Sequence, residues 1–447
     1  MRPAGRQALR NLSLPLRWLA LLARALVGTP ARAVRGTARR VGDPALQVID
    51  YWRSERATVR QAFVANSIAT VTSLASGLVL ASMERRLDEI SGFLLLIPVS
   101  IGMRGNIFGA LSARLGTLIH SGLFEISSAR DRPLYQNTYG AILLTLATSV
   151  AMGVLARAIA GLLAIDTISV WAFVLVALVG GVLSSAVVLA FTIALSIGSF
   201  RRGWDLDSVG AVLVTVVGDV VTLPCLLAAS YLVGIDVVTP VLGGIALLAG
   251  IAATALGWRT NRPMTRRIFR ESFPVLAIAI VLDILAGTVV ENRVDRVFGL
   301  YPAFLIFLPG FLEKTGALGS ILAARLGTKL HLGAASPTAR PGAAAVLDGS
   351  VVALMGVVFF SLSAVASLVT AEITGRAYPG AVPFLAATLL GAAMALVVAA
   401  AIGYYAAILS FRFGFDPDNH TIPLVTSGMD LLGAICLVLA LVVVGVA

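Results

Sequence analysis

The sequence predicts an all-α, polytopic membrane protein of about eleven transmembrane helices, built from two five-helix repeats and one linking helix. Three observations lead to this prediction. The chain is 58% hydrophobic and 13% charged, and its mean hydropathy of +0.94 is far from that of a soluble domain. Apolar runs near the ~20 residues that a spanning helix needs recur along the chain. Two blocks of sequence occur twice, each copy 211 residues after the first.

Residues 1–60 form an Arg-rich tail, which we expect to lie in the cytosol or at the membrane interface. Within the tail, residues 14–28 (LPLRWLALLARALVG) fit an amphipathic helix whose arginines reach the lipid headgroups. An organellar transit peptide has a similar composition and is the alternative. The net charge of +11 gathers in this tail and in short loops. This distribution indicates membrane topology beside anionic lipid, so we expect no nucleic-acid partner.

Eleven apolar runs follow the tail, and each predicts one membrane span. They are residues 62–82, 93–119, 138–163, 170–198, 208–234, 238–257, 272–290, 302–330, 344–370, 380–410 and 421–446. Loops after the even-numbered runs carry more arginine than most of the others, which by the positive-inside rule makes them cytosolic. We therefore expect a multi-pass protein of the cell membrane, with a cytoplasmic N-terminus and the C-terminus outside.

The sixth run has no counterpart in either repeat, and this asymmetry predicts how the repeats are oriented. Five spans return the chain on the far side of the bilayer, so a second unit joined directly would be inverted. One extra crossing makes the units parallel, related by a pseudo-two-fold axis along the membrane normal. The predicted divisions are a first repeat at 61–235, a linking helix with a basic loop at 236–270, and a second repeat at 271–447. Such an internal pseudo-dimer is expected to work as a monomer.

The two repeated blocks identify the conserved parts of each unit. The first, residues 93–122, matches residues 304–333, and the second, 203–226, matches 414–437. The matched pairs include Pro98/Pro309, Gly105/Gly316, Arg114/Arg325, His120/His331, Asp205/Asp416, Asp207/Asp418, Thr215/Thr426, Asp219/Asp430 and Cys225/Cys436. Because both blocks keep the same offset, the whole unit is a duplication.

Asp219 and Asp430 are the most informative pair, because each lies deep inside an apolar run. A carboxylate near the bilayer centre costs roughly 2.5–3.5 kcal/mol even on the lenient insertion scale, so a matched pair needs a polar or cationic partner. We interpret the two acids as halves of one cation site. The alternative is a pair of buried aspartates held by hydroxyls or by Arg114 and Arg325, which we otherwise expect to pair with carboxylates or loop carbonyls.

The blocks PVSIGMRGNIFGALSARLGT and DPDNHTIPLVTSGMD resemble the MgtE-type magnesium transporters, and in particular relatives in which two MgtE-like membrane domains are fused. The resemblance covers residues 62–447 and implies a central pore between the last helices of the two units. It implies that Asp219 and Asp430 bind hydrated Mg²⁺ as the transported ion. The second half departs from the pattern with Ala317 where the first has Asn106, and with Glu313 and Lys314 just before it.

Further residues are candidates for contact with the ion. Thr215 and Thr426 lie one helical turn before the aspartates, where they either line the pore or hydrogen-bond to their own helices. Asn106 either turns its amide oxygen toward the ion or marks a close helix contact among glycines. Asp207 and Asp418 either cap the helices or attract cations at the pore mouth.

Three other charged residues lie in or near predicted spans. Asp283 is a candidate second ion position if transport is coupled to another ion. Glu313 and Lys314 are expected to form an internal pair that serves local structure.

Three classes of function remain to be compared. The favoured one is passive or ion-coupled movement of a hard divalent cation. A membrane-embedded enzyme is disfavoured, because the chain has only three histidines and no HExxH or GxSxG motif. A non-conducting scaffold is the third class, and it predicts that the carboxylates are salt-bridged.

Overall fold

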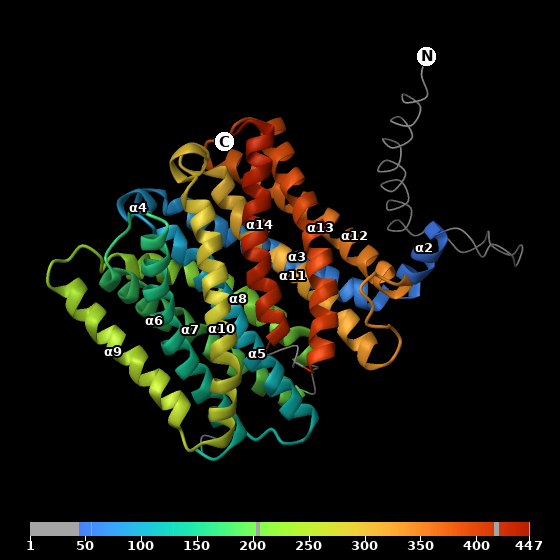
Figure 1. Ribbon diagram of the computed structural model, residues 1–447, viewed down its shortest axis with the longest axis horizontal. Coiled ribbons are helices and arrows are strands. Elements are labelled where there is room, and N and C mark those ends of the chain that lie inside the picture. The colour runs from blue at the N-terminus through green and yellow to red at the C-terminus, as the bar shows by residue number, and fades with distance from the viewer. Residues whose placement is uncertain (1–43, 55, 128, 203–205, 415–419, 447) are drawn as a thin grey trace, which may run out of the picture. The chain divides into compact units, whose positions relative to one another are not determined.

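The computed structural model describes residues 44–54, 56–127, 129–202, 206–414 and 420–446. In these residues all regular secondary structure is helical (Figure 1). The chain divides into two compact units, Met1–Arg60 and Gln61–Ala447. In the first unit, helix α2 covers Pro44–Ser54.

Each repeat contributes five long helices to the second unit. They are α3 (Arg56–Ser82, which begins in the first unit), α5 (Leu96–His120), α6 (Pro133–Leu162), α7 (Val170–Arg202) and α8 (Leu206–Ser230), then α10 (Pro263–Glu291), α11 (Ala303–His331), α12 (Ala343–Thr374), α13 (Ala381–Phe413) and α14 (Ile422–Val444). The linking helix is α9 (Val238–Arg259), and short helices are α4 (Glu84–Glu89), the 3₁₀ helix η1 (Phe93–Leu95) and the π-helix η2 (Val294–Phe298).

Within the described residues, ten helices are long and apolar enough to cross a membrane. The first of the eleven predicted runs, 62–82, forms α3, whose apolar part Asn66–Ser82 is shorter. Its buried face is polar, with Asn66, Thr70, Ser73 and Ser76 all buried, which lowers the hydropathy of this helix. Figure 1 shows α3 running across the directions of α10 and α14.

The sequence sets several helix ends through proline and glycine. Pro133 and Pro263 occupy the first positions of α6 and α10, where the missing N–H costs no hydrogen bond. Gly375 and Gly414 end α12 and α13 with φ of 67° and 65°, a left-handed conformation that glycine adopts without steric penalty. These ends limit α12 and α13 to one crossing each.

The two repeats exchange their first helices. Helix α3 of the first repeat packs on α11 of the second, and a Cβ on Gly77 would lie 2.0 Å from the Ile306 carbonyl oxygen. Helix α10 of the second repeat packs on α5 and η1 of the first, and a Cβ on Gly287 would lie 2.7 Å from Leu95 Cα. Leu95 and Ile306 are 211 residues apart, so the two crossings are related by the internal repeat.

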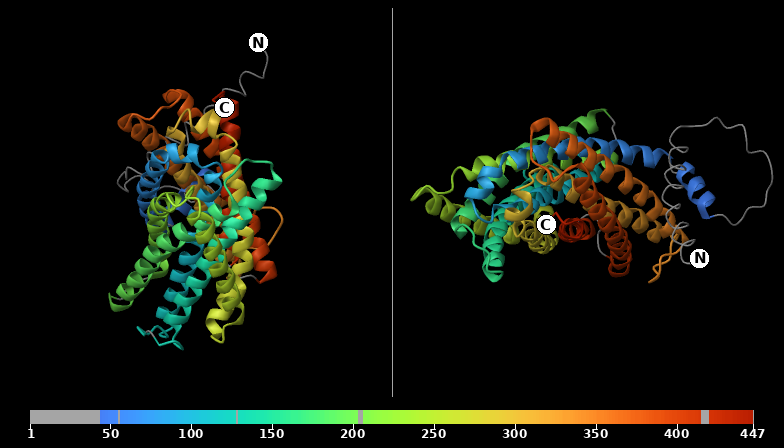
Figure 2. Two further views of the ribbon diagram at one scale, coloured as in Figure 1. Left: turned by 90° about the vertical axis from the view of Figure 1, so that its left-hand side faces the viewer. Right: turned by 90° about the horizontal axis from the view of Figure 1, so that it is seen from above.

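The remaining helices of each repeat pack with their own repeat. Helices α5 to α8 contact one another, as do α11 to α14, and α9 packs outside them on α6 and α7. Figure 2 shows α10 and α14 side by side when the unit is seen from above. The centre of the unit therefore combines α5 and α8 of the first repeat with α10, α11 and α14 of the second.

Candidate cation site

Asp219 lies in the middle of α8, and its side chain is only 4% exposed. Its backbone carbonyl accepts a 2.7 Å hydrogen bond from the Ser76 hydroxyl of α3, which fixes α8 against the exchanged helix. Its Oδ2 atom has no hydrogen-bond partner among the described residues. A buried acid in this state is costly unless a cation compensates its charge.

Asp430 of α14 is half-buried and faces Asp283 of α10. A Cβ placed on Gly102 of α5 would lie 2.9 Å from Asp283 Oδ2 and 3.7 Å from Asp430 Oδ2. The Oδ2 atoms of Asp283 and Asp430 therefore lie within about 6.6 Å of each other. The Asp283 side chain is fully buried. Ser427 lies beside it, but neither Asp283 oxygen has a partner with good hydrogen-bond geometry in the described chain.

Glu313 and Lys314 of α11 lie beside Asp219, and Glu313 also acts on Asp430. Lys314 Nζ is 3.6 Å from Glu313 Oε2, and the Lys314 side chain is 1% exposed. The predicted internal pair is confirmed. It is part of the site as well as of the local structure, because both groups interact electrostatically with Asp219.

The charged groups at the centre form one electrostatic system. Asp219 interacts with Glu313, Lys314 and Asp430, and Asp430 interacts with Asp283 and Glu313. Within the described residues, no three His, Cys, Asp or Glu side chains are grouped closely enough to ligate one metal ion directly. The described side chains thus offer separated carboxylates, an arrangement that suits an ion which keeps part of its water shell.

Asn106 and Thr426 connect the two repeats beside these acids. The Thr426 hydroxyl lies 3.3 Å from Asn106 Oδ1, and it is also 3.0 Å from the Ile422 carbonyl oxygen of its own helix. Thr215, half-buried on α8, lies against Gly105. All three residues are in close helix contacts, and their role in holding the ion stays a prediction.

The space beside Asn106 is small. A cavity of about 10 Å³ is lined by Asn106, Arg114, Ser272 and Pro423, among others, and this volume is about what one water molecule occupies. A hydrated divalent ion is larger than this cavity. Passage along this side of α5 requires the helices to separate.

The structure does not describe the side chains of two predicted site residues, Asp207 and Asp418. Asp418 lies outside the described residues, and the side chain of Asp207 does too, although its backbone is in the first turn of α8. Their proposed capping and ion-attracting roles stay predictions.

Arg114 and Arg325 lie away from Asp219 and Asp430. The Arg114 Nε donates a 3.1 Å hydrogen bond to Asn137 Oδ1, and Arg325 pairs with Asp348 at 2.8 Å. The expected pairing with a carboxylate is confirmed for Arg325, whereas the hydrogen bond of Arg114 is to a side-chain amide. The two arginines do not neutralise the central acids.

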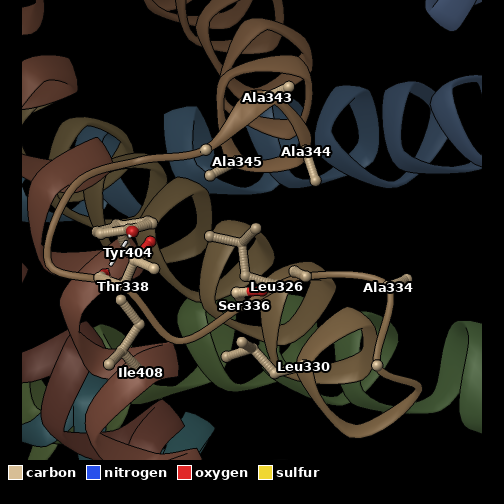
Figure 3. A pocket seen from close by; sticks show the side chains of 13 residues that line it. Leu326, Leu330, Ala334, Ser336, Thr338, Ala343, Ala344, Ala345, Tyr404 and Ile408 are labelled. Atoms are coloured by element: carbon tan, nitrogen blue, oxygen red, sulfur yellow. Dashed lines mark hydrogen bonds between the residues drawn. The ribbon is translucent and has the colours of Figure 1, made fainter.

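A separate pocket of about 340 Å³ lies between α11, α12, α13 and the loop that joins α11 to α12. Figure 3 shows Leu326, Leu330 and Ile408 at its wall, with the Tyr404 hydroxyl donating a 2.8 Å hydrogen bond to the Thr338 carbonyl. Its lining is apolar or hydroxylic and carries no charge. This pocket is therefore not part of the cation site.

The site contains acids that the repeat comparison did not select. Asp283 and Glu313 correspond to Thr72 and Gly102 in the first half, so neither has a matched partner at the 211-residue offset. The general rule that an acid inside a membrane span marks function is the signal that identifies both.

The comparisons with known proteins agree with the resemblance seen in the repeated blocks. The family model MgtE, described as "Divalent cation transporter", matches residues 97–229 and 308–440, which are again 211 residues apart and together make up more than half of the chain.

Solute carrier family 41 member 3 of Rattus norvegicus is 24% identical over 385 residues, covering 78% of this chain and 79% of that protein. The protein of the same name from Mus musculus is 22% identical over 381 residues, covering 78% and 75%. No solved structure matches. On the strength of two family matches in tandem, with a membrane-type helical fold around them, this chain belongs to the MgtE family of divalent cation transporters.

Proposed function

We propose that the protein carries Mg²⁺, or a similar hard divalent cation, across the membrane between α8 and α14, with Asp219 and Asp430 as the central acids. One observation carries the proposal. The two acids come from equivalent positions of the two repeats, yet within the described residues neither forms an ion pair with a Lys, Arg or His. A cation in transit is the partner that such a pair requires.

The chemistry of the surroundings favours Mg²⁺ over softer metals. Carboxylate, amide and hydroxyl oxygens are hard ligands, and Mg²⁺ binds through few carboxylates while it keeps several waters. Asn106, Thr215 and Thr426 offer such oxygens next to the acids. Asp207 and Asp418, each twelve residues before a central acid in the sequence, would raise the local cation concentration at the mouth of the path.

The proposed setting is a cell membrane, with the N-terminus in the cytoplasm and the C-terminus outside. The basic tail and the arginine-rich loop between α9 and α10 support this orientation, because cytoplasmic loops carry excess Lys and Arg. Since both halves of the path come from one chain, we propose that a single chain transports the ion.

Transport is favoured over the two alternatives. A non-conducting scaffold predicts salt-bridged carboxylates, whereas Asp283 and Asp430 form no ion pair within the described residues. A membrane-embedded enzyme needs a nucleophile with a base or a ligated metal, and the family to which the chain belongs is one of transporters.

The test is Mg²⁺ uptake into proteoliposomes that hold the purified full chain and a Mg²⁺-sensitive dye. The wild type should give saturable uptake, and the double variant Asp219→Asn/Asp430→Asn should fall to the rate of protein-free liposomes. The matched control is Asp236→Asn, which removes an exposed acid in the loop after α8 and should leave uptake unchanged. Undiminished uptake in the double variant would refute the central site.

A further inference from the structure

The two halves of the cation site carry different charges although the repeat makes their helices equivalent. At the positions of Glu313 and Lys314 in α11, the first repeat has Gly102 and Met103 in α5. At the position of Asp283 in α10, it has Thr72 in α3. Each half therefore has one additional acid, placed on a different helix, and only the second repeat has the lysine, while the first repeat has the buried Arg104 where the second has Thr315.

The half around Asp219 contains its own cation. Lys314 Nζ lies 3.6 Å from Glu313 Oε2 and 3.5 Å from both Ser73 Oγ and the Gly310 carbonyl oxygen. The ammonium also interacts with Asp219. When all three groups are ionised, this half carries one net negative charge, which is too little to balance a divalent ion.

In the half around Asp430, no Lys or Arg of the described residues pairs with Asp283 or Asp430, and the buried Arg104 of α5 instead donates a hydrogen bond to Ser184 of α7. The side chain of Asp283 is completely buried, and both of its oxygens lack a partner with hydrogen-bond geometry. Gly102 has no side chain, and the Asp283 carboxylate lies where a side chain would begin, with Oδ2 2.9 Å from the position of a Cβ. Ionised Asp283 and Asp430 together carry two negative charges, which one divalent cation balances.

From this difference we infer that Asp283 and Asp430 hold the divalent ion, while Lys314 is a tethered cation that occupies the Asp219–Glu313 half. The inference rests on the proposed function, because it assigns the ion to one half of the same path. One chain then binds one ion at its centre, although its repeat provides two equivalent positions. Asp219 acts on that ion at longer range, through the shared electrostatic system.

Equilibrium binding of Mg²⁺ to the purified full chain, measured by calorimetry, tests the assignment. Asp283→Asn should weaken binding by about tenfold or more, a loss of about 1.4 kcal/mol, whereas Asp219→Asn should weaken it less than about threefold. Lys314→Met, which installs the first-repeat residue, should raise the number of bound ions from one to two per chain.

The mirror-image variant tests the same idea from the other half. Met103→Lys places an amine at the position equivalent to Lys314, one residue after the Gly102 that contacts Asp283 and Asp430, and should abolish Mg²⁺ binding. Met103→Leu keeps an apolar side chain of similar size and should bind as the wild type does. Thermal unfolding and monodispersity confirm that each variant is folded, and Lys314→Gln replaces Lys314→Met if the latter is not.

The outcomes separate this inference from the proposed function. Equal losses for Asp219→Asn and Asp283→Asn, unchanged stoichiometry in the Lys314 variants, or retained binding in Met103→Lys would overturn the inference while Mg²⁺ uptake by the wild type still supports transport. A wild type that neither binds Mg²⁺ nor transports it would overturn both.

Discussion

Arg325 and Asp348 form a 2.8 Å ion pair that joins α11 to α12 where the first repeat has a hydrogen bond from an arginine to a neutral amide. Arg114 and Asn137, 211 residues earlier, are joined by a 3.1 Å hydrogen bond between Nε and Oδ1. The Asp348 side chain is fully buried and also pairs with Lys329 at 2.7 Å. The internal repeat has thus kept the contact between the second and third helices of each unit while its chemistry has changed.

This difference predicts unequal effects of removing the two arginines. Arg325→Gln should lower the free energy of unfolding by about 3 kcal/mol, the lower end for breaking a buried ion pair, since Lys329 still contacts Asp348. Arg114→Gln should cost only about 1.5 kcal/mol, the lower end for a hydrogen bond that involves a charged group. Unfolding in mixed detergent micelles measures both, and losses of equal size would contradict the distinction.

The crossing of α3 over α11 predicts a strict requirement for glycine at position 77. A Cβ there would lie 2.0 Å from the Ile306 carbonyl oxygen, so Gly77→Ala should cost about 3 kcal/mol through overpacking. The matched control is Gly198→Ala in α7, where a Cβ would meet nothing within 4 Å and helix propensity should improve stability by up to about 1 kcal/mol. Thermal unfolding midpoints decide between them, and a stable Gly77→Ala protein would argue against this crossing.

The contact between Asn106 and Thr426 predicts a moderate effect on ion affinity. Asn106→Ala copies Ala317 of the second repeat and removes one hydrogen bond, so the KM for Mg²⁺ uptake should rise roughly twofold to tenfold. The maximal rate should stay close to that of the wild type, because the acids are intact. Thr426→Val should have a similar effect, and combining the two should add little, since both remove the same contact. Additive effects would show that the residues act independently.

The proposed orientation predicts which loops are reached from each side of the membrane. In a Cys225→Ser/Cys436→Ser background, Asn261→Cys lies in the basic loop between α9 and α10 and should react with an impermeant maleimide only after cells are opened. Asp236→Cys, in the loop before α9, should react in intact cells, because one crossing separates the two positions. The reverse pattern would invert the topology and contradict the positive-inside interpretation.

The sequence alone determined the helical membrane fold, the duplication and the family. Hydropathy identifies the spans because burying apolar length in lipid is a local property of each segment. The 211-residue offset between Asp219 and Asp430 is readable without coordinates, and the family matches at 97–229 and 308–440 confirm it. The internal Glu313–Lys314 pair was also predictable, since the two residues are adjacent.

The tertiary structure decided which charges share the site. Asp283 meets Asp430 because α10 lies between α14 and the helices of the first repeat, and Lys314 reaches Ser73 because α3 crosses over to α11. Neither contact can be read from the sequence. Asp283 and Lys314 have no matching residue in the first repeat, and the residues in contact lie far apart in the chain. Contacts between the exchanged helices depend on how distant segments pack together. The sequence of a single segment does not specify that packing.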